Sequence, residues 1–164
     1  MKKGILLLNL GTPSGCDVSS VRRYLAEFLM DPYVVDVPYL VRWLLVHGLI
    51  LRTRPARSAE AYQSIWTDKG SPLLVHSQAL SDAVSDKLSA SYQVALGMRY
   101  GQPSIATAAK SLFDCDEICV LPLFPQYSLA ATESAGSASA LIVGLDNGKI
   151  IGNSTCEAIA DTTS

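Results

Sequence analysis

The sequence has little charge, only two histidines and no cysteine motif. The formal net charge is −2, which argues against a nucleic-acid partner whose affinity would depend on neutralising phosphates. The four cysteines form no C-x-x-C pair and no disulfide framework, so we expect reduced thiols in a cytoplasmic protein. Hydrophobic residues make up 49% of the 164 residues, which predicts one folded domain of ordinary size.

Motifs for phosphate binding and nucleophilic catalysis are also missing. The turn after the first apolar run, residues 11–13, fits neither a dinucleotide-binding loop nor a P-loop, and no G-x-S-x-G elbow occurs. Cys115 and Cys119 alone would leave a zinc site half built. His47 is expected to be a packed core histidine, and His76 a surface or capping residue. We therefore predict no bound cofactor, no metal ligand and no catalytic residue in this chain.

The longest apolar stretch, residues 37–51 (VPYLVRWLLVHGLIL), is too short to span a membrane. A buried helix is the favoured interpretation, because the stretch has no clean polar face. The alternative is an interfacial helix that makes a peripheral membrane contact, since Tyr39 and Trp43 suit a headgroup region. Basic residues follow the stretch: Arg52, Arg54 and Arg57. The basic start and short apolar run of residues 1–11 are interpreted as a strand, because the run is shorter than a signal peptide needs.

Apolar runs alternate with helical periods along the chain. Strands are predicted at residues 4–10, 92–98 and 118–124, and this alternation is typical of an α/β fold with a doubly wound parallel sheet. Helices are predicted at residues 18–29, 38–51, 55–66, 73–88 and 103–113. A further short strand is predicted at residues 149–151.

The carboxyl ends of the three predicted strands carry distinctive residues, namely 9–13, Arg99 with Tyr100, and 126–128. Functional groups gather at such ends, so these residues should face one crevice. Arg99 can hold a carboxylate by two parallel hydrogen bonds, and Tyr100 can stack on a flat ligand. A salt bridge to a helix together with a packed tyrosine is the structural alternative.

Five blocks of sequence, in order and in register, resemble the amino-terminal half of ferrochelatase. The resemblance covers residues 3–135, and residues 136–164 form a tail that departs from the family pattern. The blocks are GILLLNLGTP at 4–13, RRYLAEFLMDPYVVD at 22–36, IWTDKGSPLLVHS at 65–77, VALGMRYGQPSI at 94–105 and VLPLFPQYS at 120–128.

The resemblance implies insertion of ferrous iron into a porphyrin, protoporphyrin IX or coproporphyrin, in haem biosynthesis. Iron is then a substrate and not a resident cofactor. The family fold has two Rossmann-type α/β domains with the porphyrin in the cleft between them. By resemblance, residues 28–32 form part of the lip of this cleft. The implied porphyrin-binding residues are Leu10, Arg99, Tyr100, Gln126, Tyr127 and Ser128.

The family's histidine motif, S-x-H-[GS]-[IL]-P, and its glutamate near the carboxyl end do not occur in this sequence. We therefore expect this chain to be a truncated form that lacks the catalytic half, is inactive alone, and self-associates through uncovered apolar surface. The first alternative is a non-enzymatic porphyrin-binding or assembly module completed by a separate second half. A small single-domain chelatase working as a homodimer is a weaker alternative, because both histidines are predicted on helices.

Overall fold

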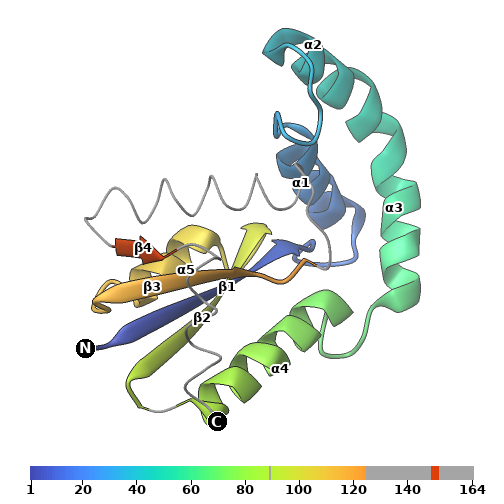
Figure 1. Cartoon of the computed structure of the whole chain (residues 1–164). Coiled ribbons are helices and arrows are strands. Elements are labelled where there is room, and N and C mark those ends of the chain that lie inside the picture. Colours follow the sequence, from blue (N-terminus) through green and yellow to red (C-terminus); the bar gives the residue numbers. More distant parts are fainter. Residues whose placement is uncertain (89, 125–148, 152–164) are drawn as a thin grey trace. The chain divides into compact units, whose positions relative to one another are not determined.

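A computed structural model describes residues 1–88, 90–124 and 149–151 (Figure 1). The chain divides into two compact units. The sheet unit comprises residues 1–10, 77–99 and those from 103 onward, and the helical unit comprises residues 11–76 and 100–102. The predicted boundary between a domain at 3–135 and a tail at 136–164 falls mostly outside the described residues and stays a prediction.

The sheet has the strand order β2-β1-β3-β4. The strands are β1 (Lys3–Gly11), β2 (Tyr92–Tyr100), β3 (Glu117–Pro122) and β4 (Lys149–Ile151). β1 pairs with β3 in parallel, with Leu6 opposite Val120, and β3 pairs with β4 in parallel. β2 runs in the same direction as β1 (Figure 1). The predicted α/β class, its three parallel strands and the short strand at 149–151 are confirmed.

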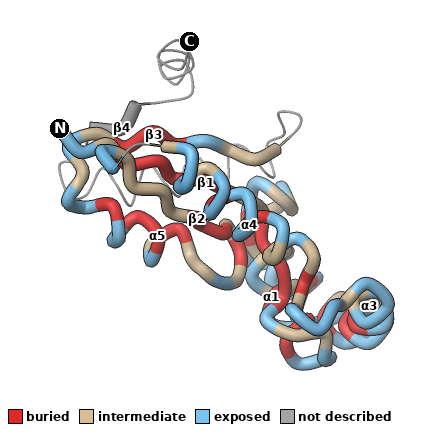
Figure 2. Tube along the Cα trace, turned by 90° about the horizontal axis from the view of Figure 1, so that it is seen from below, coloured by how far each residue is buried: buried red, intermediate tan, exposed pale blue. Residues whose placement is uncertain are grey.

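The core of the sheet unit lies between the strands and α5 (Ile105–Ser111). β1 is a continuous apolar run because both faces of a covered parallel sheet are buried, and Figure 2 shows this long buried stretch. Gly97 lets α5 approach β2, since a Cβ atom there would lie 3.2 Å from the Ile105 Cα atom. The buried members of this core are Leu6, Leu8, Ile105, Ala108, Ala109, Leu112, Ile118 and Val120.

The helical unit is built from α1 (Val18–Leu29) and a helical run from residue 39 to residue 65. Asp17 caps α1 by accepting hydrogen bonds from the backbone N–H groups of Ser19 and Ser20. The long run consists of α2 (Tyr39–Trp43), the π-helix η1 (Leu44–Ile50) and α3 (Leu51–Ile65). The helix α4 (Pro72–Lys87) follows, and its residues from Ser77 onward belong to the sheet unit.

The apolar stretch at 37–51 is exposed, so the prediction of a buried helix is wrong. Only Arg42, Val46 and Leu51 are buried there, while Leu40 is 73% exposed and Leu44 is 63% exposed. One narrow side of the run packs inward and the remaining apolar side chains face outward. The exposed ones are Tyr39, Leu40, Val41, Trp43, Leu44, Leu45 and Leu49, here called the apolar face. No helix among the described residues is long and apolar enough to cross a membrane.

One further expectation is corrected. The third helix was predicted from residue 55, but it begins at Leu51 and carries Pro55 in its interior, because it continues directly from η1. Cys16 and Cys115 are free thiols, as expected.

Candidate functional site

In the sheet unit, the ends of β1 and β2 bring two predicted site residues to one edge of the sheet. Leu10 lies at the end of β1 and Arg99 near the end of β2, and both are half-buried. The strands are neighbours in the sheet. The Asn9 side-chain amide donates a 2.9 Å hydrogen bond to the Ser77 hydroxyl, and the Asn9 Oδ1 atom accepts one from the Leu10 N–H. These bonds fix the backbone that presents Leu10.

In the helical unit, Gly11 and Gly101 allow two chain segments to approach closely. Both have positive φ angles, +108° and +84°, which only glycine adopts readily. A Cβ atom at Gly11 would clash with the Tyr100 carbonyl oxygen, and one at Gly101 would lie 2.6 Å from the Thr12 carbonyl oxygen. The Gly-Thr-Pro turn is therefore a packing requirement, which its sequence alone did not distinguish from a ligand loop.

Tyr100 is buried, and its hydroxyl group is engaged by the protein. The hydroxyl donates a 2.8 Å hydrogen bond to Asp31 Oδ2, and the two residues are 1% and 5% exposed. Asp31 also accepts from the Tyr33 N–H at 2.8 Å through its other carboxylate oxygen. The Asp31 carbonyl oxygen accepts from the N–H groups of Val34 and Val35, each at 3.1 Å. Asp31 thus organises the turn at residues 31–36 and anchors it to Tyr100.

The Tyr100 ring belongs to an aromatic cluster in the helical unit. Phe28 contacts it edge-on with ring centroids 5.2 Å apart, and Tyr24 does so at 6.5 Å. The Tyr24 hydroxyl donates a 3.3 Å hydrogen bond to the Gly11 carbonyl oxygen. Burial raises the pKa values of Tyr24 and Tyr62, which further disfavours ionisation of both phenols. The cluster comprises Tyr24, Phe28, Tyr62, Trp66 and Tyr100.

Two more buried polar contacts were not anticipated from the sequence. The Thr12 hydroxyl donates a 2.8 Å hydrogen bond to the Ser71 hydroxyl, and both residues are 4% exposed. Arg42 is 7% exposed and donates a 3.0 Å hydrogen bond from Nη1 to the Val35 carbonyl oxygen. Its Nε atom has no hydrogen-bond partner within the described part of the chain. The available signal in the sequence was the presence of polar residues inside the blocks that resemble ferrochelatase, such as Asp31-Pro32 and Gly70-Ser71-Pro72.

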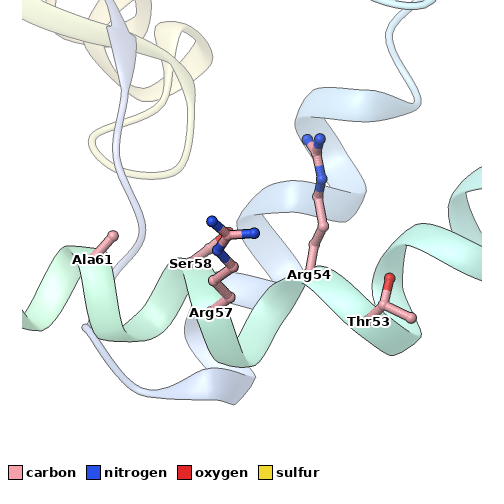
Figure 3. Close-up of a pocket in the computed structure, with 5 residues that line it drawn as sticks. All are labelled: Thr53, Arg54, Arg57, Ser58 and Ala61. Atoms are coloured by element: carbon pink, nitrogen blue, oxygen red, sulfur yellow. The ribbon is translucent and has the colours of Figure 1, made fainter.

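A groove of about 570 Å³ runs along α3 (Figure 3). Figure 3 shows Arg54 and Arg57 extending from one side of the helix. The spacing of three residues places their guanidinium groups about one turn apart. No ion pair involving either arginine occurs among the described residues. The groove is lined by Thr53, Arg54, Arg57, Ser58 and Ala61.

A smaller cavity of about 210 Å³ lies in the helical unit between α1 and the turn after β1. Arg23 and Glu27 line it, and both are tied to neighbours. Arg23 Nη2 donates a 3.0 Å hydrogen bond to the Ser20 hydroxyl, and Glu27 accepts a 3.3 Å bond from the Gly101 N–H. The two charged side chains of the cavity are therefore engaged by hydrogen bonds within the helical unit.

The histidines are both on the surface. His47 is exposed in η1 and stacks on Trp43 with ring centroids 5.2 Å apart, so the prediction of a packed core histidine is wrong. His76 is exposed on α4, as predicted for a surface residue. Among residues 1–88, 90–124 and 149–151 no cluster of three or more His, Cys, Asp or Glu side chains could hold a metal ion.

The predicted porphyrin-binding residues are thus only partly described. Leu10 and Arg99 share one edge of the sheet, and Tyr100 packs with Asp31 and Phe28 in the helical unit. Gln126, Tyr127 and Ser128 lie outside the described residues. The structure therefore leaves the predicted crevice as a hypothesis, with Leu10 and Arg99 as its described members.

Comparison with known proteins identifies the family. Residues 2–143 match the family model for ferrochelatase. The chain is 57% identical over 135 residues to the ferrochelatase of Legionella pneumophila strain Paris, covering 82% of this chain and 41% of that protein. It is also 57% identical over 136 residues to the ferrochelatase of Coxiella burnetii strain RSA 493, covering 82% and 38%. The chain thus spans about two fifths of the length of these curated relatives, and it belongs to the ferrochelatase family.

Proposed function

We propose that the protein inserts ferrous iron into a porphyrin, with this chain forming one wall of the porphyrin site. The observation that carries the proposal is the 57% identity to two ferrochelatases, over 135 and 136 residues. Iron is the metal substrate of this reaction and the porphyrin is the organic substrate. The chain's share of the work is to bind and orient the macrocycle.

The half-buried groups at the sheet edge suit a flat, mostly apolar macrocycle with carboxylate substituents. Leu10 offers an apolar contact at the end of β1, and Arg99 offers a guanidinium group near the end of β2. A guanidinium group can bind a carboxylate through two parallel hydrogen bonds, which fixes orientation as well as position. We propose that Gln126, Tyr127 and Ser128 complete the opposite wall. Tyr100 contributes its buried ring and its bond to Asp31.

Metal insertion also needs a base for the pyrrole protons, and general base catalysis contributes roughly a hundred- to ten-thousandfold. The family's histidine motif is absent from this sequence, and both histidines are exposed on helices. We therefore expect this chain alone to bind porphyrin without inserting iron at an enzymatic rate. A second polypeptide segment with the histidine and glutamate would supply the base.

The test combines porphyrin titration with an anaerobic iron-insertion assay. The chain should shift the porphyrin absorbance band on binding, and Arg99→Gln should weaken binding of a dicarboxylate porphyrin more than the matched surface change Arg22→Gln. Turnover should appear only when the carboxyl-terminal part of the Legionella pneumophila enzyme is added. Porphyrin binding with no turnover after that addition would favour the non-enzymatic assembly module, and no binding at all would refute the proposal.

We further propose that the apolar face makes a peripheral contact with a membrane surface on its cytoplasmic side. Its support is the exposure of Leu40, Leu44 and Trp43, followed along the same helical run by the groove that carries Arg54 and Arg57. Apolar side chains with flanking arginines favour an anionic lipid surface. The chain should sediment together with anionic vesicles, and the double variant Leu40→Ser with Leu44→Ser should remain in the supernatant. Concentration-dependent self-association without vesicle binding would instead favour a second copy as the partner.

A further inference from the structure

The turn at residues 31–36 is held by two buried charged side chains, which is unusual for a short surface connection. Asp31 is 5% exposed and Arg42 is 7% exposed. Burying a charge is costly unless hydrogen bonds compensate for the lost water. Asp31 has this compensation, because its carboxylate accepts from the Tyr100 hydroxyl and the Tyr33 N–H. The turn therefore has a defined conformation that depends on Asp31.

Arg42 supports the other end of the same turn. Its Nη1 atom donates to the Val35 carbonyl oxygen at 3.0 Å, and Val35 in turn donates its N–H to the Asp31 carbonyl oxygen. The turn is thus clamped between Tyr100 on one side and α2, which carries Arg42, on the other. A change in the Asp31–Tyr100 bond would be transmitted to both segments, since Asp31 accepts from Tyr100 and its carbonyl oxygen accepts from Val35, which Arg42 holds.

Tyr100 is restrained in three ways besides this bond. Its ring contacts Phe28 and Tyr24, and its carbonyl oxygen lies against Gly11. Because the phenol is 1% exposed and its hydroxyl donates to Asp31, the hydroxyl is committed to the protein in this structure. Tyr100 therefore influences ligand binding through the position of its backbone, and the residue before it in the chain is Arg99.

We propose that Asp31 is a positioning residue for porphyrin binding, because its carboxylate fixes Tyr100 and the 31–36 turn together. The inference rests on the proposed porphyrin-binding function. Charge-assisted hydrogen bonds are about twice as strong as neutral ones and hold a narrow geometry, so Asp31 sets the conformation of residues 99–101 before the ligand arrives. If the Asp31 carboxylate is replaced by a neutral group or removed, residues 99–101 sample other conformations, which reduces the fraction of molecules that are ready to bind porphyrin.

The experiment is a double-mutant cycle on porphyrin affinity in the full chain. Asp31→Asn and Tyr100→Phe should each weaken porphyrin binding roughly tenfold. The porphyrin affinity of the double variant should be no lower than that of the single variant that binds less tightly. Tyr62→Phe, in the same aromatic cluster, is the matched control and should bind as the unmodified chain does. Tyr100→Phe also protects the test against misfolding, because it removes only the hydroxyl group.

Affinity is measured well below the unfolding midpoint, and urea unfolding is recorded for every variant. A merely structural role would lower the midpoint and leave affinity unchanged in Tyr100→Phe and Asp31→Asn, which would overturn the inference. Additive losses of affinity in the double variant would also overturn it. No porphyrin binding by the unmodified chain would refute the proposed function and this inference together. Binding by the unmodified chain with unchanged affinity in the variants would refute this inference alone, so the two failures are distinguishable.

Discussion

The sheet unit and the helical unit bury different kinds of side chain. The sheet unit packs an aliphatic core, exemplified by Leu8 and Leu112, which are both fully buried. The helical unit buries the charged residues Asp31 and Arg42 and the phenol of Tyr100, while it leaves a row of apolar side chains exposed. The difference indicates that the first unit is stabilised mainly by its aliphatic core, whereas specific polar and aromatic contacts add to apolar packing in the second.

This contrast has a functional meaning. Exposed apolar residues cost little stability where they stand, but large patches of them mark surfaces that meet a partner or ligand. A unit that is held by directional bonds keeps its shape even when its apolar side chains are turned outward. The helical unit therefore resembles a preorganised binding element, and the sheet unit resembles its scaffold.

The largest expected effect is at the close approach of Gly11 to Tyr100. Gly11→Ala adds a Cβ atom against the Tyr100 carbonyl oxygen at a positive φ angle, and it should cost about 3–5 kcal/mol of unfolding free energy. Gly48→Ala is the matched control, because no atom lies within 4 Å of a Cβ there. Urea unfolding measures both. Equal stability of the two variants would show that the helical unit does not depend on the contact between Gly11 and Tyr100.

The second prediction concerns the aliphatic core. Leu8→Ala should lower the unfolding free energy by about 2–5 kcal/mol, because it removes buried methyl groups and leaves a cavity. Leu40→Ala removes the same atoms from a side chain that is 73% exposed, and it should change stability by about 0.5 kcal/mol or less. A loss of more than about 2 kcal/mol in Leu40→Ala would mean that the apolar face is covered in solution.

The third prediction weighs a single polar bond of the helical unit. Tyr100→Phe leaves the Asp31 carboxylate without one of its buried donors, so the free energy of unfolding should fall by about 1–3 kcal/mol. Phe28→Leu, which keeps the hydrogen bond and removes the ring contact, separates the aromatic contribution. Should Tyr100→Phe prove neutral in urea unfolding, the polar account of this unit would fail.

The smallest effect is expected at the start of α1. Hydrogen bonds from Ser19 and then Ser20 hold the pKa of Asp17 below its ordinary value, so the folded state favours the carboxylate. The stability that this provides is present above the ordinary pKa of about 3.9 and is lost as the pH falls through the lower folded value. Asp17→Asn should therefore flatten the decline of stability that begins as the pH falls below about 4 and continues toward the lower folded value. An unchanged decline in thermal unfolding would count against the cap.

The sequence predicted the sheet unit well because its strands and helix are indicated by patterns of neighbouring residues. Unbroken apolar runs such as residues 4–10 identify buried parallel strands. Pro103 was predicted at the first helical position, and the helix begins two residues later, at Ile105, after the cap residue Ser104. In the helical unit the same rules failed, since residues 37–51 have the composition of a buried helix but lie on the surface. The Asp31–Tyr100 bond joins residues 69 positions apart, and no periodicity encodes such a pairing.

The candidate site was predictable to a similar degree. Strand-end logic placed Leu10 and Arg99 on one edge, since parallel strands end on the same side of a sheet. The same logic left Tyr100 open between a ligand contact and a packed tyrosine. Its hydroxyl is bonded to Asp31 and its ring is buried, and its contact with a ligand stays a prediction. Side-chain direction at the last residue of a strand depends on the neighbouring turn, which here requires Gly11 to lie against Tyr100 and Gly101 against Thr12.

The π-helix η1 has a consequence for how this helical run can change length during evolution. A π segment within an α-helix accommodates an extra residue while the flanking turns keep their directions. Loss of one residue from Leu44–Ile50 would restore ordinary α-helical winding and leave Tyr39 and Thr53 on their present sides. Loss of one residue within α3 would instead rotate everything on one side of it by about 100°. Insertions and deletions among relatives should therefore accumulate at η1.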